Sequence, residues 1–159
     1  MTAVETPAPF EIARIRPQLL RRGKTIDRLA RTDTLSLGVQ VVAPADGETN
    51  LHSHPGTDSA WVVLDGEAMF YGTGEDVEVA VLGKNEMIMI PADAPYWFKA
   101  SSDVPLVILH ITARTKDWVE GMSRKDFKPP KEWFENRTHD EDGRALMGSE
   151  PIPGAFFGS

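Results

Sequence analysis

Two histidines stand one residue apart in the segment "NLHSHPGTDSAWVVLDG", residues 50 to 66, just before an apolar run. Residues two apart in a β-strand point to the same face, so His52 and His54 are expected to present adjacent imidazoles. Neutral imidazole binds metals such as Fe, Zn, Mn and Ni, and a rigid strand holds two rings without reorganisation. The spacing therefore predicts a divalent transition-metal site. The alternative is an exposed loop with two hydrogen-bonded histidines.

Three other side chains are candidates to complete this site. His110 lies in an otherwise apolar run, "PLVILHITA", where it is either a metal ligand or an ordinary pocket residue. Tyr96 could be a phenolate ligand, a general acid or base, or a hydrogen-bonding pocket residue. Asp58 follows the histidine pair but reaches the same face only if the strand carries a bulge there.

A pocket around these groups can be predicted from strand parity. Its expected lining is Asn50, Ser59, Trp61, Met69, Tyr71, Met89 and Phe98. Most side chains in such apolar stripes are simply core. If some of them line a cavity, its aromatic and thioether groups suit an apolar or aromatic small organic molecule.

The segments that must position these residues are short and strand-like. Between about residues 34 and 113, apolar or alternating runs such as "TLSLGVQVVA", "SAWVVLDG" and "EMIMIPA" are separated by turn sequences such as "PADGE" and "GTGED". Many closely spaced strands without intervening helices predict an antiparallel sandwich or barrel. The "DGE" at residues 65–67 predicts a hairpin turn.

The two ends of the chain have a different character. We divide the sequence into an N-terminal arm (1–33), a barrel (34–115) and a C-terminal tail (116–159) with several prolines and scattered aromatics. The tail is expected to pack on the barrel or on a partner subunit. The arm contains the alternating segment "FEIARI", which could add to the sheet edge of a second copy, so we expect a homodimer.

Composition narrows the possible partners. The 159 residues carry 17 Lys and Arg against 24 Asp and Glu, a formal net charge of -7, which disfavours nucleic acid as a partner. Cysteine is absent, which excludes disulfides and thiolate chemistry. With no signal-peptide pattern and no apolar run of membrane-spanning length, we expect a cytoplasmic protein without a membrane partner.

The order of the motifs resembles the cupin superfamily. Gly47, "HSH" at residues 52–54 and Gly66, followed by "LGKNEMIMIPADAPYWF", are similar to the two motifs of that superfamily. The resemblance implies an all-β, double-stranded β-helix (jelly-roll) barrel. Two departures stand out, because Ser59 occupies the position of the family's glutamate and Tyr96 that of its third histidine.

The resemblance implies three possible functions. The first is a metal-dependent enzyme that uses Lewis-acid and proton-transfer chemistry on a small organic substrate, as an isomerase, lyase or cyclase does. In that case His52 and His54 hold the metal, His110, Tyr96 or Asp58 completes the shell, and Tyr96 or His110 moves a proton. The second is an Fe(II)-dependent dioxygenase, and the third is a non-catalytic protein that binds a small molecule.

Overall fold

We describe the protein from a computed structural model, which covers residues 3–4, 9–74, 76–132 and 136–158. The described residues form fourteen strands. They are β1 (Ala3–Val4), β2 (Ile12–Ala13), β3 (Gln18–Arg31), β4 (Leu35–Val42), β5 (His52–Ser53), β6 (Thr57–Asp65), β7 (Ala68–Gly72), β8 (Glu78–Leu82), β9 (Met87–Ile90), β10 (Tyr96–Ala100), β11 (Leu106–Arg114), β12 (Lys125–Asp126), β13 (Thr138–His139) and β14 (Ala145–Phe156).

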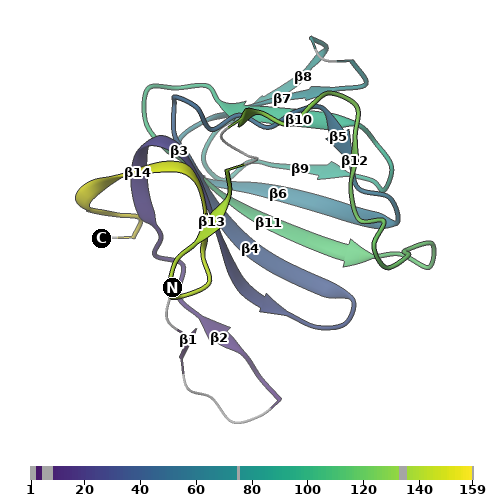
Figure 1. Cartoon of the computed structure of the whole chain (residues 1–159), viewed down its shortest axis with the longest axis horizontal. Helices are drawn as coiled ribbons and strands as arrows, with labels where there is room; N and C mark the ends of the chain where they lie inside the picture. The colour runs from purple at the N-terminus through teal and green to yellow at the C-terminus, as the bar shows by residue number, and fades with distance from the viewer. Residues whose placement is uncertain (1–2, 5–8, 75, 133–135, 159) are drawn as a thin grey trace.

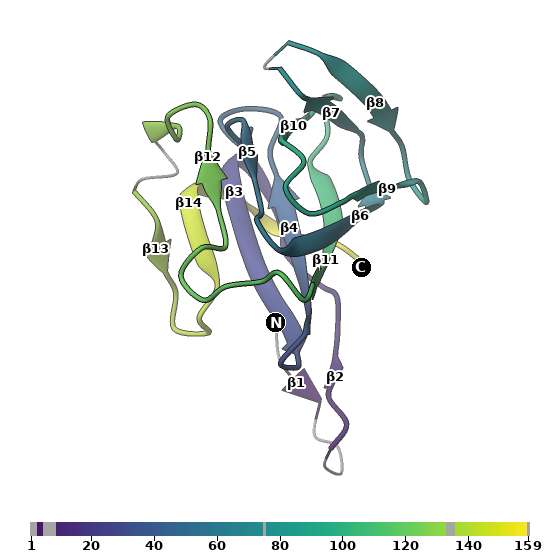
Figure 2. The ribbon, with the colours of Figure 1, turned by 90° about the vertical axis from the view of Figure 1, so that its right-hand side faces the viewer.

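Two antiparallel sheets face each other and enclose the lumen of a barrel (Figure 1). The larger sheet has the order β13-β14-β3-β4-β11-β6-β9, and the smaller has the order β12-β5-β10-β7-β8. The short β1–β2 hairpin projects away from them (Figure 2). This arrangement confirms the all-β, double-stranded β-helix fold. Within the described part of the chain, no helix is long and apolar enough to cross a membrane.

The core between the sheets forms because alternate residues of each strand point inward. Trp61 and Val63 of β6, Phe70 of β7 and Phe98 of β10 belong to one buried cluster. Trp61 and Phe98 have ring centroids 4.8 Å apart, and those of Phe70 and Phe98 are 5.0 Å apart. These rings fill part of the lumen.

Both ends of the chain contribute to the larger sheet. β3 lies between β14 and β4, with Thr25 opposite both Leu146 and Val41. The sheet therefore begins before residue 34 and includes a tail strand, unlike the predicted division. The reason lies in β3 itself, where Arg21, Arg22 and Lys24 interrupt the apolar alternation by which a strand is predicted from sequence.

The predicted hairpin at residues 65–67 is wrong in one respect. Gly66 has the positive φ expected of such a turn, 79°, and a Cβ there would lie 2.7 Å from the Pro105 carbonyl oxygen. However, β6 belongs to the larger sheet and β7 to the smaller one. The turn thus carries the chain from one sheet to the other instead of joining two paired strands.

Candidate functional site

The two histidines lie where three segments meet. His52, in β5, is opposite Tyr96 of β10 on one side and Asp126 of β12 on the other. His54 follows directly after β5. The ring centroids of His52 and His54 are 4.9 Å apart, and that of Tyr96 is 4.6 Å from His52. The spacing predicted from strand parity is therefore realised, and Tyr96 joins the pair.

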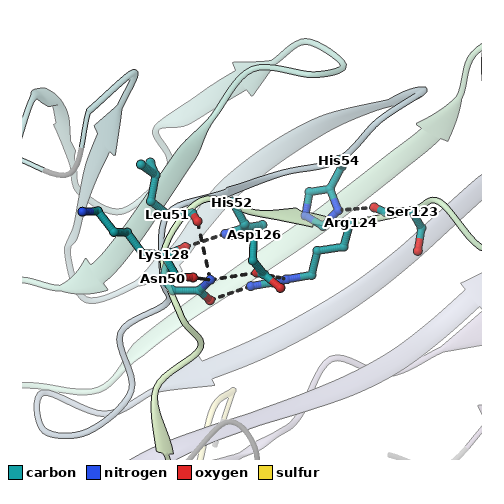
Figure 3. A network of polar contacts seen from close by, with 8 residues as sticks. All are labelled: Asn50, Leu51, His52, His54, Ser123, Arg124, Asp126 and Lys128. Atoms are coloured by element: carbon teal, nitrogen blue, oxygen red, sulfur yellow. Dashed lines mark hydrogen bonds and ion pairs between the residues drawn. The ribbon is translucent and has the colours of Figure 1, made fainter.

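Backbone carbonyls orient both imidazoles. The Nδ1 of His52 is 2.6 Å from the carbonyl oxygen of Asn50, and the Nδ1 of His54 is 2.9 Å from that of Ser123 (Figure 3). A carbonyl only accepts, so each Nδ1 must carry the hydrogen and each Nε2 keeps its lone pair. This is the arrangement in which a histidine binds a metal through Nε2 while its other nitrogen is held by an outer partner.

A polar network fixes the tail against the histidine strand (Figure 3). The Asn50 side-chain amide donates to Asp126 Oδ1 at 2.8 Å and to the Lys128 carbonyl oxygen at 2.9 Å. Arg124 donates to Asn50 Oδ1 at 2.7 Å and to Asp126 Oδ1 at 2.9 Å. Burial raises the pKa of Asp126, but the hydrogen bonds from Asn50 and Arg124 outweigh it and lower that pKa. Asp126 is thus a carboxylate that holds the tail in place.

The histidines of the site are neutral. Burial, followed by the charge of Arg124, lowers the pKa of His52 to about 3. Burial also lowers the pKa of His54, although the hydrogen bond to Ser123 opposes the change. A ligand nitrogen that carries no proton at neutral pH needs no deprotonation before it binds a metal.

Tyr96 places a hydroxyl at the centre of the site. The residue is buried, and its hydroxyl makes no hydrogen bond of regular geometry among the described residues, although the Trp61 indole lies close enough to lower its pKa against the effect of burial. Burial raises the pKa of Tyr96, so the free site contains a neutral phenol. A buried hydroxyl without a regular hydrogen bond is unfavourable in the absence of a ligand, so this group is available to a substrate or a metal.

His110 lies at the edge of the site, and its ring contacts Trp61 and Ser59. It stacks on Trp61 with centroids 3.6 Å apart and an interplanar angle of 5°, and its Nε2 lies 3.3 Å from Ser59 Oγ. Its centroid is 6.4 Å from that of His54. Burial, followed by the charges of His54 and Lys24, lowers its pKa well below the ordinary value. His110 is therefore a neutral wall of the site next to the histidine pair.

Several residues predicted for the site lie elsewhere. Asp58 is exposed and accepts a hydrogen bond from the Ala92 backbone at 2.8 Å. β6 pairs with β11 without a bulge at this point, so the alternative of an inward Asp58 is wrong. Tyr71 stacks on Trp97 at 4.0 Å, on the face of the smaller sheet away from the lumen.

Two methionines also lie away from the lumen. Met69 alternates with the inward residues Ala68 and Phe70 and so points outward. Met89 is 69% exposed. These three side chains do not face the lumen, because the inward face of β7 and β9 is the opposite one. Tyr71 and Met89 nevertheless line a second, apolar cavity of about 190 Å³ together with Phe70 and Tyr96, so the predicted lining is wrong for Met69 alone of the three. Of the rest, Trp61 and Phe98 belong to the core, and the Asn50 side chain holds the tail.

An open cavity of about 510 Å³ leads to His54 and His110. Among the described residues, its lining includes five arginines and no aspartate or glutamate: Arg28, Arg31, Arg114, Arg124 and Arg137. Trp118 of the tail lies against one of them, 3.7 Å from the Arg114 guanidinium carbon. None of these arginines was singled out from the sequence, because they come from β3, β11 and the tail, which only the fold brings together.

The side chains of the site supply donors for a metal. Two imidazole Nε2 atoms and the Tyr96 hydroxyl are available, and the outer partners of both histidines are in place. Within the described residues, no three His, Cys, Asp or Glu side chains are grouped to hold a metal. The donors fit a metal held by two histidines, with the Tyr96 hydroxyl beside it and positions left open to water or substrate.

Comparisons with known proteins agree on the fold. Residues 38–112 match the family model described as a cupin domain. The search of curated proteins finds no match. Among solved structures, an uncharacterised conserved protein with a double-stranded β-helix domain from Klebsiella pneumoniae subsp. pneumoniae is similar with a TM-score of 0.53 at 17% identity, covering 64% of this chain and 82% of that one.

Two further solved structures share the fold. A cupin-like protein from Thermotoga maritima has a TM-score of 0.54 at 20% identity, with 65% of this chain and 75% of that chain covered. A structure described under DMSP lyases has a TM-score of 0.52 at 18% identity, with 66% and 53% covered. At these identities the likeness concerns the fold alone. Residues 38–112 thus resemble a cupin domain, and the chain shares the double-stranded β-helix fold of these structures.

Proposed function

We propose that this protein is a metal-dependent enzyme that moves a proton on a small organic substrate, as an isomerase, lyase or cyclase does. The observation that carries the proposal is the joint placement of His52, His54 and Tyr96. Two neutral imidazoles expose their Nε2 lone pairs beside a buried phenol whose hydroxyl makes no hydrogen bond of regular geometry among the described residues.

Each residue has a distinct role in this proposal. His52 and His54 would hold the metal, and the carbonyls of Asn50 and Ser123 keep the rings oriented. When bound, the metal would supply Lewis-acid polarisation of a substrate oxygen. Tyr96 would hold or deliver the proton at its hydroxyl oxygen, since burial keeps it protonated in the free site. The aromatic wall of Trp61 and His110 would exclude water from that side.

A second candidate is a non-catalytic protein that binds a small molecule. It is favoured by the absence of a carboxylate ligand among the described residues and by the cations near the histidines, which disfavour a dication. An Fe(II) dioxygenase with a three-histidine shell is less well supported, because the His110 ring is stacked on Trp61 and its Nε2 faces Ser59.

The metal content of untagged protein separates these functions. After loading and desalting, we expect about one transition metal per chain, and most of it should be lost in His52→Ala and in His54→Ala. His139→Ala is the matched control, because His139 is exposed on β13, away from the site. Full metal occupancy in the double His52→Ala, His54→Ala protein would refute the metal site. A protein that never retains metal would favour the non-catalytic alternative.

A further inference from the structure

A buried lysine lies on the lumen face of β3. Lys24 is 3% exposed, and its Nζ lies 5.1 Å from the Phe98 ring centroid, inside the barrel. Ile26 and Arg28, at two and four residues further along the strand, line the cavity, as parity requires. The contact that the structure shows for the Lys24 ammonium is this one with the Phe98 ring. A buried cation in this state is unfavourable unless something else compensates it.

The surroundings of Lys24 add further donors and positive charge. The charges of Arg124 and Arg137 act on Lys24, and the charge of Lys24 in turn acts on His52, His54 and His110. Arg124 shares its charge with Asp126, whose carboxylate points to the tail network. Positive charges therefore lie close to one another around Lys24.

A buried amide points to the same place. Gln40 of β4 is opposite Ile26, lines the cavity and is buried, and its Oε1 has no partner among the described residues. An amide can turn about its last bond to present either its oxygen or its nitrogen. Next to Lys24 and Arg28, it can therefore offer an N–H donor to a bound anion.

We infer that the cavity binds a small organic carboxylate, with Lys24 and Arg28 as the anion-binding pair, Gln40 as a further donor, and the rest of the molecule directed at His54 and Tyr96. This inference names the substrate class of the proposed function. It rests on that function only for the part of the molecule that would react at His54 and Tyr96. Arginine binds a carboxylate through two parallel N–H donors, and lysine binds one through its ammonium. A cavity of about 510 Å³ is large enough for such a molecule.

A carboxylate fits the donors better than a phosphate does. Phosphate sites commonly use several backbone N–H groups from a glycine-rich loop or the N-terminus of a helix. The sequence contains no glycine-rich phosphate loop. Arg28 and Gln40 line the cavity among the described residues, and Lys24 lies two residues before Ile26 on the same face of β3. Two or three such groups match the two oxygens of a carboxylate.

The test is isothermal titration of the chelator-treated full chain, so that no metal contributes. The probes are succinate and benzoate, the neutral amides succinamide and benzamide, and inorganic phosphate. We expect at least one carboxylate to bind, its amide to bind at least tenfold more weakly, and Lys24→Met and Arg28→Gln each to weaken carboxylate binding tenfold or more. Lys99→Met is the matched control. The Lys99 Nζ also lies over an aromatic ring, 5.8 Å from the Tyr71 centroid, but on the outer face.

Several outcomes would overturn the inference. They are equal binding of an amide and its carboxylate, unchanged binding in both Lys24→Met and Arg28→Gln, tighter binding of phosphate through the same residues, and no carboxylate binding at all. Arg28 is exposed at the mouth, so Arg28→Gln keeps the test valid if Lys24→Met does not fold. Carboxylate binding that appears only after metal loading would refute the role of Lys24 but support the proposed metal site. Carboxylate binding by a chain that never retains metal would support the role of Lys24 and refute the proposed metal site.

Discussion

Replacing Lys24 by methionine removes a buried cation but keeps the length of the side chain. Burial, followed by the charges of Arg124 and Arg137, lowers the pKa of Lys24 from 10.5 to about 7. At 1.36 kcal/mol per pH unit, this difference corresponds to about 5 kcal/mol against the charged form in the folded state. Relaxation and water penetration reduce such penalties in real proteins. We therefore expect Lys24→Met to raise the free energy of unfolding by roughly 3 kcal/mol at pH 7.

The lowered pKa of Lys24 also determines how the free energy of unfolding changes with pH. Between pH 7 and 10.5 the unfolded chain binds a proton at Lys24 that the folded chain does not, so the stability of the unaltered protein rises with pH in this window. The advantage of Lys24→Met should fall to less than about 1 kcal/mol at pH 10. Urea unfolding at both pH values, with chelator present and Lys99→Met as the control, measures it. A Lys24→Met protein that is less stable than the original at pH 7 would refute the reasoning, because the ammonium would then have a favourable partner.

Three further predictions concern the site and the assembly. Tyr96→Phe should keep the metal, lower turnover by roughly a hundredfold or more, and raise stability by up to about 1 kcal/mol by removing a buried hydroxyl without a regular hydrogen bond; unchanged turnover would leave Tyr96 with a space-filling role. Asn50→Ala should weaken metal binding by roughly tenfold or more by releasing the tail, and unaltered metal affinity would contradict this. Light scattering should give a dimer through the exposed Phe10 and Ile12 of the arm, whereas a mass near 17.6 kDa would contradict it.

Strand parity predicted the barrel and the histidine pair because both depend on local sequence. The runs around Trp61, Phe98 and His110 are short, largely apolar and bounded by turn residues, and each became a strand of the expected sheet fold. The same parity argument placed Asp58 on the opposite face from Ser59, as the structure has it. It failed for β7 and β9, where both faces are apolar and the sequence contains no signal to choose between them.

The rest of the site depends on contacts between distant segments. Ser123 and Asp126 are about seventy residues from the histidines they support, and β12 is only two residues long, too short for any periodicity. Lys24 lies in a strand whose charged residues resemble a solvated surface. A buried cation of this kind can be recognised only when β3 is seen to lie inside the larger sheet, between β14 and β4, with Lys24 facing Phe98 of the smaller sheet.

The distribution of charge connects the fold to the proposed chemistry. The chain has a net charge of -7, yet among the described residues the cavity lining contains five arginines and no carboxylate. A cleft lined by one sign of charge, within a protein of the opposite sign, concentrates the field at its mouth and attracts anions there. The tail strengthens this arrangement, because Asn50 and Asp126 fix Arg124 beside the histidines instead of leaving it in solvent. A positive site also favours the anionic form of a substrate over its neutral acid, so the groups that bind the carboxylate would keep it ionised while Tyr96 retains the proton to be transferred.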